Sequence, residues 1–214
     1  GLYPVQCRGV VIKDSYVMGA SDAGIYVGQS QDILVKGNLV EFNVAGIEVE
    51  NSSSALVESN VAKNNSGGIL VFDLPDLSMY GNNIIVKNNT IYDNNTINFA
   101  RPSNIVAALP SGTGVMVLAA KNVLITENNL GFHKTTGILL LSYLTTGRPV
   151  KDKNYDPYLE NVSVKNNQYY LSGFLPSQGA DAYINEKILQ IEKTVGSLFP
   201  DIMWDGYKLK TKQK

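Results

Sequence analysis

The sequence has very little of three things that common functional sites require: cysteine, histidine and net charge. Its 214 residues include one cysteine, Cys7, and one histidine, His133. A single cysteine excludes an internal disulfide framework and a Cys-x-x-Cys metal site, and a single histidine excludes a histidine cluster as a metal centre. The formal net charge is −1 and only 17% of residues are charged. Nucleic-acid binding, which requires a basic stripe, is therefore not expected.

Long apolar runs are absent as well. No stretch of about 18 consecutive apolar residues occurs, so the sequence predicts no membrane-spanning helix. The apolar content of 44% is nevertheless enough for a buried core. With so few charges, the surface must be rich in Asn, Ser, Thr and Tyr, which favours an extended repeat protein over an ordinary globular domain.

What the sequence does have is a repeat of 22 residues. Three glycine-led segments recur at that interval: Gly24-Ile25-Tyr26-Val27, Gly46-Ile47-Glu48-Val49 and Gly68-Ile69-Leu70-Val71. Apolar residues alternate within each segment, which is typical of a short strand with one face turned inward. Three strands in about 22 residues leave too little chain for a helical repeat. The sequence therefore predicts an all-β fold, a right-handed parallel β-helix of about six coils.

Asparagine recurs at two places in each coil. Stacking brings equivalent residues to about 4.8 Å from one another, so two columns of asparagine are expected. An amide carries both donors and an acceptor, and each can serve backbone groups at a turn and its neighbours in the column. One column would contain Asn38, Asn60, Asn89, Asn128 and Asn167, and the other Asn43, Asn65 and Asn94, with His133 in the next place.

The two ends of the chain differ. We expect residues 1–171 to form the β-helix and to lack an N-terminal part, because Gly1 occupies the place of Gly24 with nothing ahead of it. An uncapped coil leaves open self-association through this end. Residues 172–214 are predicted to form a C-terminal cap and tail. Apolar residues near helical spacing indicate a helical segment from Asp181 to Leu198, which Pro200 ends.

Three insertions interrupt the repeat, at 73–83, 93–113 and 142–161. All three border the sheet of glycine-led strands, and insertions that gather on one face of a repeat protein commonly mark its binding face. On this face the outward positions include Tyr3, Tyr26, Glu48 and Glu50. A carboxylate beside aromatic rings suits a sugar polymer, in a groove along the solenoid axis. The alternative interpretation is that Glu48 is one surface acid among 19 and that the tyrosines are ordinary strand formers.

His133 and a cluster of acids allow two further interpretations. A histidine transfers protons near neutral pH, but the register of His133 equally makes it a structural cap on the second asparagine column. No metal site is predicted, and no calcium loop of fixed spacing is present. Calcium is nevertheless left open as a cofactor, because its oxygen ligands could come from Glu48, Glu50, Asp73 and Asp76.

Blocks of the sequence resemble a known family. GLYPVQC (1–7), GGILVFDLP (67–75) and SYLTTGRPVKDKNYDPY (142–158) are similar to bacterial right-handed parallel β-helix repeat proteins of the pectate-lyase-like superfamily, near alginate-epimerase-like sequences. The resemblance covers most of residues 1–171 and implies a secreted, periplasmic or cell-surface protein with further N-terminal coils. The Asp-Pro-His-Asp motif of alginate epimerases does not occur here, and only Asp156-Pro157-Tyr158 shares part of it, so no catalytic role is carried over.

Two functions from different classes follow from these observations. The first is a polysaccharide-associated enzyme, a uronate-polymer lyase or epimerase that abstracts the C5 proton with a base, an acid and a group that neutralises the carboxylate. A hydrolase using Glu48 and Asp73 is a variant. The second is a non-catalytic envelope or cell-surface solenoid that binds glycans or protein partners. The candidate catalytic residues are Glu48 or His133 as base, Tyr26 as acid, and Lys134 or Arg148 as neutraliser; the candidate substrate-binding residues are Tyr3, Glu50, Asp73 and Tyr143.

Overall fold

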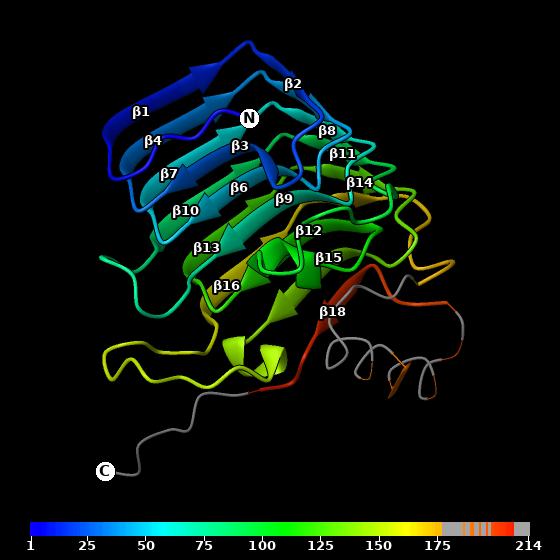
Figure 1. The fold of residues 1–214 in the computed structure, drawn as a ribbon. Helices are drawn as coiled ribbons and strands as arrows, with labels where there is room; N and C mark the ends of the chain where they lie inside the picture. Colours follow the sequence, from blue (N-terminus) through cyan, green and yellow to red (C-terminus); the bar gives the residue numbers. More distant parts are fainter. Residues whose placement is uncertain (177–185, 187–188, 191–192, 194–195, 197, 208–214) are drawn as a thin grey trace.

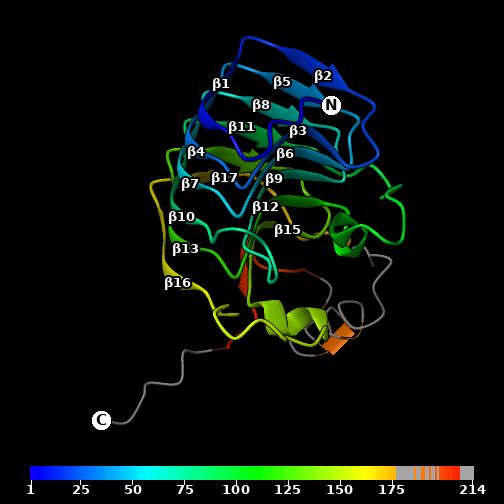
Figure 2. The same cartoon turned by 60° about the vertical axis from the view of Figure 1, so that its left-hand side comes forward.

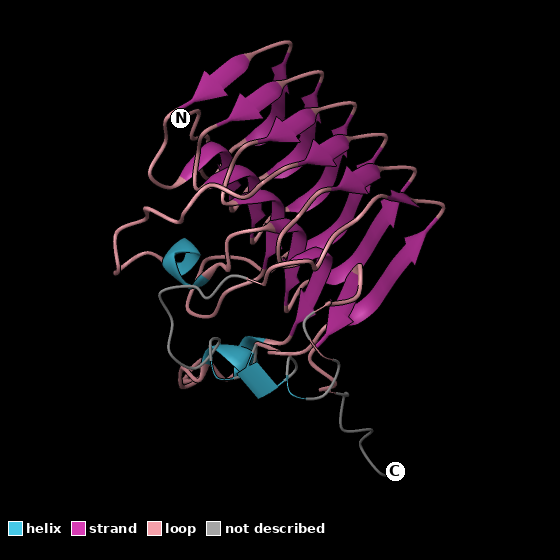
Figure 3. Cartoon of the chain, turned by 90° about the vertical axis from the view of Figure 1, so that its right-hand side faces the viewer, coloured by secondary structure: helices cyan, strands magenta, loops and turns pink. Residues whose placement is uncertain are grey.

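The structure is a solenoid of stacked coils. It is a computed structural model that describes residues 1–176, 186, 189–190, 193, 196 and 198–207. Three parallel sheets of six strands run along the stack, which confirms the predicted right-handed parallel β-helix (Figure 1). Figure 3 shows the coils stacked edge to edge, with the helical turns on one side of the stack.

Each coil contributes one strand to each sheet. The glycine sheet, named for its glycine-led strands, consists of β3 (Ala23–Gly28), β6 (Ala45–Glu50), β9 (Gly67–Phe72), β12 (Thr113–Leu118), β15 (Thr136–Leu141) and β18 (Ile202–Trp204). The second sheet consists of β1 (Arg8–Lys13), β4 (Gln31–Lys36), β7 (Ser53–Glu58), β10 (Asn82–Lys87), β13 (Lys121–Thr126) and β16 (Glu160–Lys165). The third consists of β2 (Tyr16–Met18), β5 (Leu39–Glu41), β8 (Val61–Lys63), β11 (Thr90–Tyr92), β14 (Asn129–Gly131) and β17 (Gln168–Tyr169).

The register predicted from the alternation of apolar residues is confirmed. Ile25 pairs with Ile47, and Ile47 with Ile69, while Tyr26 pairs with Glu48 on the opposite face. A slip of one residue would exchange the two faces of every strand. All nine residues predicted to point inward have no exposed surface: Ile25, Val27, Ile47, Val49, Ile69, Val71, Val115, Val117 and Ile138.

Both asparagine columns are present and continuous. The backbone N of Asn60 donates to Asn89 Oδ1 at 2.9 Å, and its Nδ2 donates to the same oxygen and to Val35 O, each at 3.0 Å. The same pattern links the next pair, Asn89 and Asn128. Each amide thereby serves a buried turn and the coil above it. The second column ends as predicted on His133, whose Nδ1 accepts from the backbone N of Asn94 at 3.4 Å.

The C-terminal region adds a strand that the sequence analysis did not predict. β18 pairs in parallel with β15 and completes the glycine sheet, so Trp204 lies in a strand rather than in a polar tail. Most of the predicted helical segment from Asp181 to Leu198 lies outside the described residues. At the other end, the first coil joins β3 through two isolated bridges, Leu2 with Ile25 and Val5 with Gly28.

The outer face of the glycine sheet is largely covered, which corrects the expectation of an open groove along the axis. Side chains of β9, β12 and β15 that point outward are buried, among them Leu70 and Met116. They form a second apolar cluster with Leu109 from the loop of the 3₁₀ turn η1 (Ile105–Ala108) and with Tyr143 from η2 (Tyr143–Thr146). Figure 1 shows η1 in front of β12 and β15, and Figures 1 and 2 show η2 at the lower end of the stack. The insertions therefore cover the sheet, and only its β3–β6 end remains accessible.

Replacing an asparagine inside a column should destabilise the fold. Asn60→Ala removes the acceptor for two hydrogen bonds from Asn38 and the donor to Val35. Each buried group left without a partner costs about 1–3 kcal/mol. We expect a loss of at least that size in the free energy of unfolding, measured by urea denaturation. Asn129→Ala, at an exposed position of β14, is the control and should change it by less than about 0.5 kcal/mol. Equal midpoints for the two variants would show that water already serves the turn.

Candidate functional site

A pocket of about 380 Å³ lies at the accessible end of the glycine sheet. Residues from β3 and β6 form one side of it, and the loop that carries η1 forms another. The first coil contributes the remaining side. Its lining residues are Tyr3, Val5, Asp22, Tyr26, Glu48, Glu50, Asn104 and Ile105. Four of them, Tyr3, Tyr26, Glu48 and Glu50, are candidates from the sequence, and the structure brings these four together.

Two tyrosines stack along the solenoid axis in this pocket. The rings of Tyr3 and Tyr26 have centroids 4.7 Å apart and an interplanar angle of 16°. Tyr3 Oη donates to Asp22 Oδ2 at 2.5 Å, and Tyr26 Oη donates to Glu50 Oε1 at 2.6 Å. Burial, together with these carboxylate partners, raises the pKa of both tyrosines. Both phenols therefore stay protonated and act as donors.

Gly28 allows the Tyr26 ring to take this position. Tyr26 and Gly28 point outward from the same strand two residues apart, and Gly28 pairs with Glu50 across the sheet. A Cβ atom on Gly28 would overlap the Tyr26 ring. Without that atom, the ring lies flat over the backbone and its hydroxyl reaches the Glu50 carboxylate one coil away.

Glu48 is buried at the floor of the pocket. Its exposed fraction is 1%, and its Oε2 has no hydrogen-bond partner among the described residues. Burial raises the pKa of Glu48 well above its ordinary value, and the nearby charges of Glu50 and Asp22 raise it further. Burial also raises the pKa of Glu50, although the hydrogen bond from Tyr26 opposes that shift. Glu48 points outward as predicted, but the interpretation of it as a surface acid is wrong.

Asp73 and Tyr143 do not line the pocket. Both are buried in the loops that cover the sheet. Asp73 Oδ1 accepts from the backbone N of Gly81 at 2.8 Å, and Tyr155 Oη donates to the carbonyl oxygen of Asp73 at 2.5 Å. Burial raises the pKa of Asp73 to about 7. Tyr143 packs edge to face on Tyr155, with ring centroids 5.5 Å apart. Both residues therefore hold the loops together, and neither lines the pocket although both are candidate substrate-binding residues.

The other three catalytic candidates are also away from the pocket. His133 has no exposed surface, and its two ring nitrogens contact the backbone N of Asn94 and the carbonyl oxygen of Ile91. Burial lowers the pKa of His133 to about 4. Lys134 follows it at the same corner, and Arg148 is exposed just after η2. The predicted set of base, acid and neutralising cation is thus not assembled at this pocket.

Two polar residues of the pocket were missed from the sequence. Asp22 lies four residues before Tyr26, so the alternation of the strand turns both side chains to the outer face. This alternation could have identified Asp22 from the sequence. Asn104 comes from the second insertion, and no periodicity places such a residue against the sheet. Asn104 reaches the first coils only because the inserted loop folds back against them.

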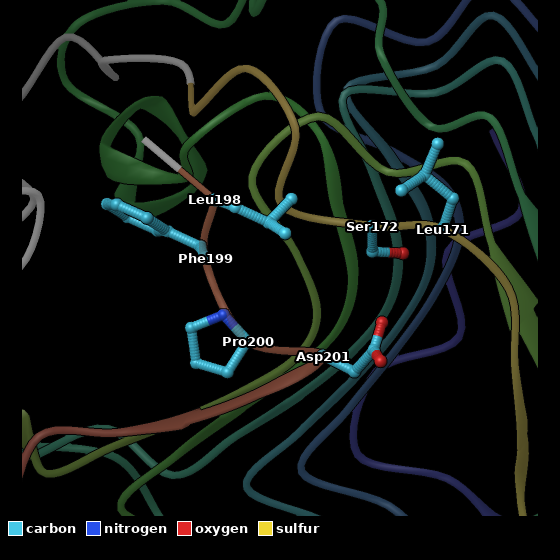
Figure 4. Close-up of a pocket in the computed structure, with 6 residues that line it drawn as sticks. All are labelled: Leu171, Ser172, Leu198, Phe199, Pro200 and Asp201. Carbon is cyan, nitrogen blue, oxygen red and sulfur yellow. The ribbon is translucent and has the colours of Figure 1, made fainter. Parts of the chain in front are cut away.

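A second pocket, of about 430 Å³, lies at the other end of the solenoid and contains none of the candidate residues. Figure 4 shows its lining, in which the carboxylate of Asp201 points toward Ser172. Asp201 Oδ1 is buried without a hydrogen-bond partner among the described residues. Ser172 Oγ accepts from the backbone N of His133 at 3.4 Å, so this pocket borders the end of the second polar column.

Within the described residues, no three or more His, Cys, Asp or Glu side chains are grouped so that they would hold a metal ion. Within the same residues, no helix has both the length and the apolar character that crossing a membrane requires.

Solved structures with a similar fold include two epimerases and a lyase. The periplasmic alginate epimerase AlgG has 16% sequence identity and a TM-score of 0.51, over 79% of this chain and 46% of that one. The A-module of the mannuronan C-5 epimerase AlgE4 of Azotobacter vinelandii has 17% identity and a TM-score of 0.48, over 76% and 54%. An alginate lyase from Paenibacillus has 14% identity and a TM-score of 0.44, over 78% and 69%. The chain spans about half the length of the two epimerase structures.

A family model identifies the chain from its sequence. The model of the periplasmic copper-binding protein (NosD) family matches residues 1–148 of the 214. The chain therefore belongs to the NosD family, a family of parallel β-helix proteins. The resemblance to bacterial β-helix repeat proteins is thereby confirmed for the fold. No curated protein matches the sequence.

Glu48→Gln should stabilise the protein at neutral pH. Because the folded state raises the pKa of Glu48, ionisation in the unfolded chain above about pH 4.5 favours unfolding, so stability falls as pH rises. Glutamine keeps the shape and removes this penalty. We expect a higher melting temperature at pH 7.5 and little difference at pH 4. Glu41→Gln is the control and should not stabilise, because the pKa of Glu41 is lowered, chiefly by a hydrogen bond from Tyr16. Destabilisation by Glu48→Gln at pH 7.5 would mean that the carboxylate is ionised and bound.

His133 should make the fold sensitive to acid. Its pKa falls from 6.5 to about 4 on folding, so the unfolded chain binds more protons between these values and stability decreases as pH falls. The lost contribution amounts to about 3 kcal/mol by pH 4. His133→Asn continues the asparagine column and removes the titration. Thermal melts should show a smaller loss between pH 6.5 and pH 4 for this variant. An unchanged acid slope would contradict the structural role of His133.

Proposed function

We propose that this NosD-family protein binds a glycan, with a sugar ring held in the pocket beside Tyr3, Tyr26 and Glu48. The observation that carries the proposal is the unpaired, buried Oε2 of Glu48 at the floor of a pocket flanked by stacked tyrosines. A buried polar atom without a partner costs about 1–3 kcal/mol, and a ligand donor would recover that free energy. Sugar hydroxyls are such donors.

The shape of the pocket supports a ligand of this kind. Its volume of about 380 Å³ is at the lower end of the range of about 300–1,000 Å³ for small-molecule sites, which suits a ring or two of a longer chain. Tyr3 is 45% exposed although its ring stacks on Tyr26. An aromatic face and an array of carboxyl oxygens together match the apolar face and the hydroxyl rim of a sugar.

The charge of the pocket favours binding over chemistry on a uronate. Abstraction of the C5 proton requires a cation to neutralise the sugar carboxylate. The lining holds the carboxyl groups of Asp22, Glu48 and Glu50 and has no Lys, Arg or His. A uronate would be repelled there. The lyase or epimerase activity therefore receives no support from this geometry, and we propose the non-catalytic role in glycan binding as the primary function.

Glycoside hydrolysis is a second candidate, and one observation favours it. Glu48 and Glu50 project from the same strand into the same pocket, and burial favours the protonated form of Glu48. In such a reaction Glu48 would give its proton to the leaving oxygen, while Glu50 as carboxylate would activate a water or attack the sugar carbon. Asp73, the partner expected from the sequence, does not line the pocket, so Glu50 takes its place in this alternative.

The histidine and the cysteine of the chain do not fit a copper site, although copper appears in the description of the family. Copper in proteins is bound mainly by histidine, cysteine and methionine. The only histidine is buried with both ring nitrogens in contact with backbone groups, and the only cysteine is Cys7, whose Sγ donates to Val5 O at 3.3 Å. We therefore assign no role to copper.

Calcium on Glu48, Glu50, Asp73 and Asp76 stays a prediction. We place the protein in the periplasm or another compartment outside the cytoplasm, in accord with the family description.

Removal of the exposed tyrosine tests the proposal. The chain would be titrated by calorimetry against a panel of neutral, amino-bearing and uronate oligosaccharides. For each ligand that binds, Tyr3→Ala should weaken the affinity at least tenfold. Tyr16→Ala removes an exposed tyrosine that donates to Glu41 on the third sheet, and it should leave the affinity unchanged. Retention of affinity in Tyr3→Ala, or no binding of any member of the panel, would contradict the proposal.

A further inference from the structure

We infer that the group bound at the floor of the Tyr3–Glu48 pocket is a protonated amine, so the glycan is one that contains amino sugars. This inference rests on the proposed function and names its ligand class. It follows from the acidic groups of the pocket, from their hydrogen bonds and from the stacked tyrosines beside them.

The pocket has an excess of acidic groups with no basic partner. Asp22, Glu48 and Glu50 all line it, and none of the three forms an ion pair within the described part of the chain. Elsewhere on the solenoid acids do have such partners, as Glu58 has in Lys36 at 2.8 Å. The imbalance is local, and it attracts a cation to this pocket.

The hydrogen bonds leave three carboxyl groups with free acceptor atoms. Tyr3 Oη donates to Asp22 Oδ2, and Tyr26 Oη donates to Glu50 Oε1, so one oxygen of each carboxyl group already accepts a hydrogen bond. Glu48 Oε2 has no partner among the described residues. An ammonium group has three donors and no acceptor, so it can bond to more than one of these acids. A hydroxyl group has one donor and would leave two of the acids unserved.

The acids of this pocket suit an ammonium group better than a bare metal ion. A calcium or magnesium ion needs several oxygens at about 2.0–2.6 Å, and the acids of the described residues form no such group. An ammonium group binds carboxylates at longer donor–acceptor distances of about 2.7–2.9 Å. The stacked tyrosines also suit it, because the face of an aromatic ring attracts a cation. Carried on a sugar ring beside Tyr3, an amine would be held by both features.

Calorimetry with three matched tetrasaccharides tests the inference. The ligands are tetraglucosamine, its fully N-acetylated form and cellotetraose, which carry an amine, an amide or a hydroxyl at the same carbon. At pH 6 and low salt, we expect tetraglucosamine to bind at least tenfold more tightly than the other two, and its affinity to fall with added salt. Glu50→Gln should weaken the binding of tetraglucosamine at least tenfold. Asp22→Asn is a second variant in case the first does not fold. Glu41→Gln is the matched control, since Glu41 also accepts from a tyrosine but lies on the third sheet.

The outcomes separate this inference from the glycan proposal. Equal affinity for the three ligands, all weakened by Tyr3→Ala, would overturn the amine and keep the glycan. Tight binding of tetraglucosamine that survives both acidic-residue variants would also overturn the amine inference. No binding of any of the three ligands would overturn the inference, and with the whole panel negative it would overturn the proposed function as well.

Discussion

The register between neighbouring coils is the constraint on which the rest of this structure depends. Each residue of a strand pairs with its equivalent one coil away, as Ile47 does with Ile25 and Ile69, so the position of one coil fixes the next. The asparagine columns maintain this register at the turns, since each amide bonds to a backbone group and to the next amide. The interior can then be wholly aliphatic, because the polar requirements of the turns are met within the columns.

The same stacking creates the candidate site. Tyr3 and Tyr26 lie one above the other because they occupy equivalent places in successive coils, and Glu48 follows in the next place of the same row. In the later coils that row is filled by Leu70 and Met116, and loops cover it. The outward positions of this row are thus apolar and covered by loops in the later coils, but polar and open to the pocket in the first coils. That change confines the pocket, and the acidic groups in it, to one end of the solenoid.

The fold could be predicted almost entirely from the sequence, but the site only in part. Alternation around Gly24 and Gly46 fixed which side chains point inward, and the spacing of asparagines located the polar columns. The same register placed Tyr26 and Glu48 on one face. It could not show that Glu48 is buried, because burial there depends on how inserted loops without periodicity pack. For the same reason the sequence missed Asn104, and it placed Tyr143 over the site although that residue packs on Tyr155.

We propose that the unpaired carboxyl oxygen of Glu48 marks the place where a ligand donor binds. A crystal structure of the protein with tetraglucosamine would show this directly. We expect an amine nitrogen within hydrogen-bond distance of Glu48 Oε2, with its sugar ring beside Tyr3. A sugar bound on another face of the solenoid, with the Glu48 pocket filled only by water, would contradict it.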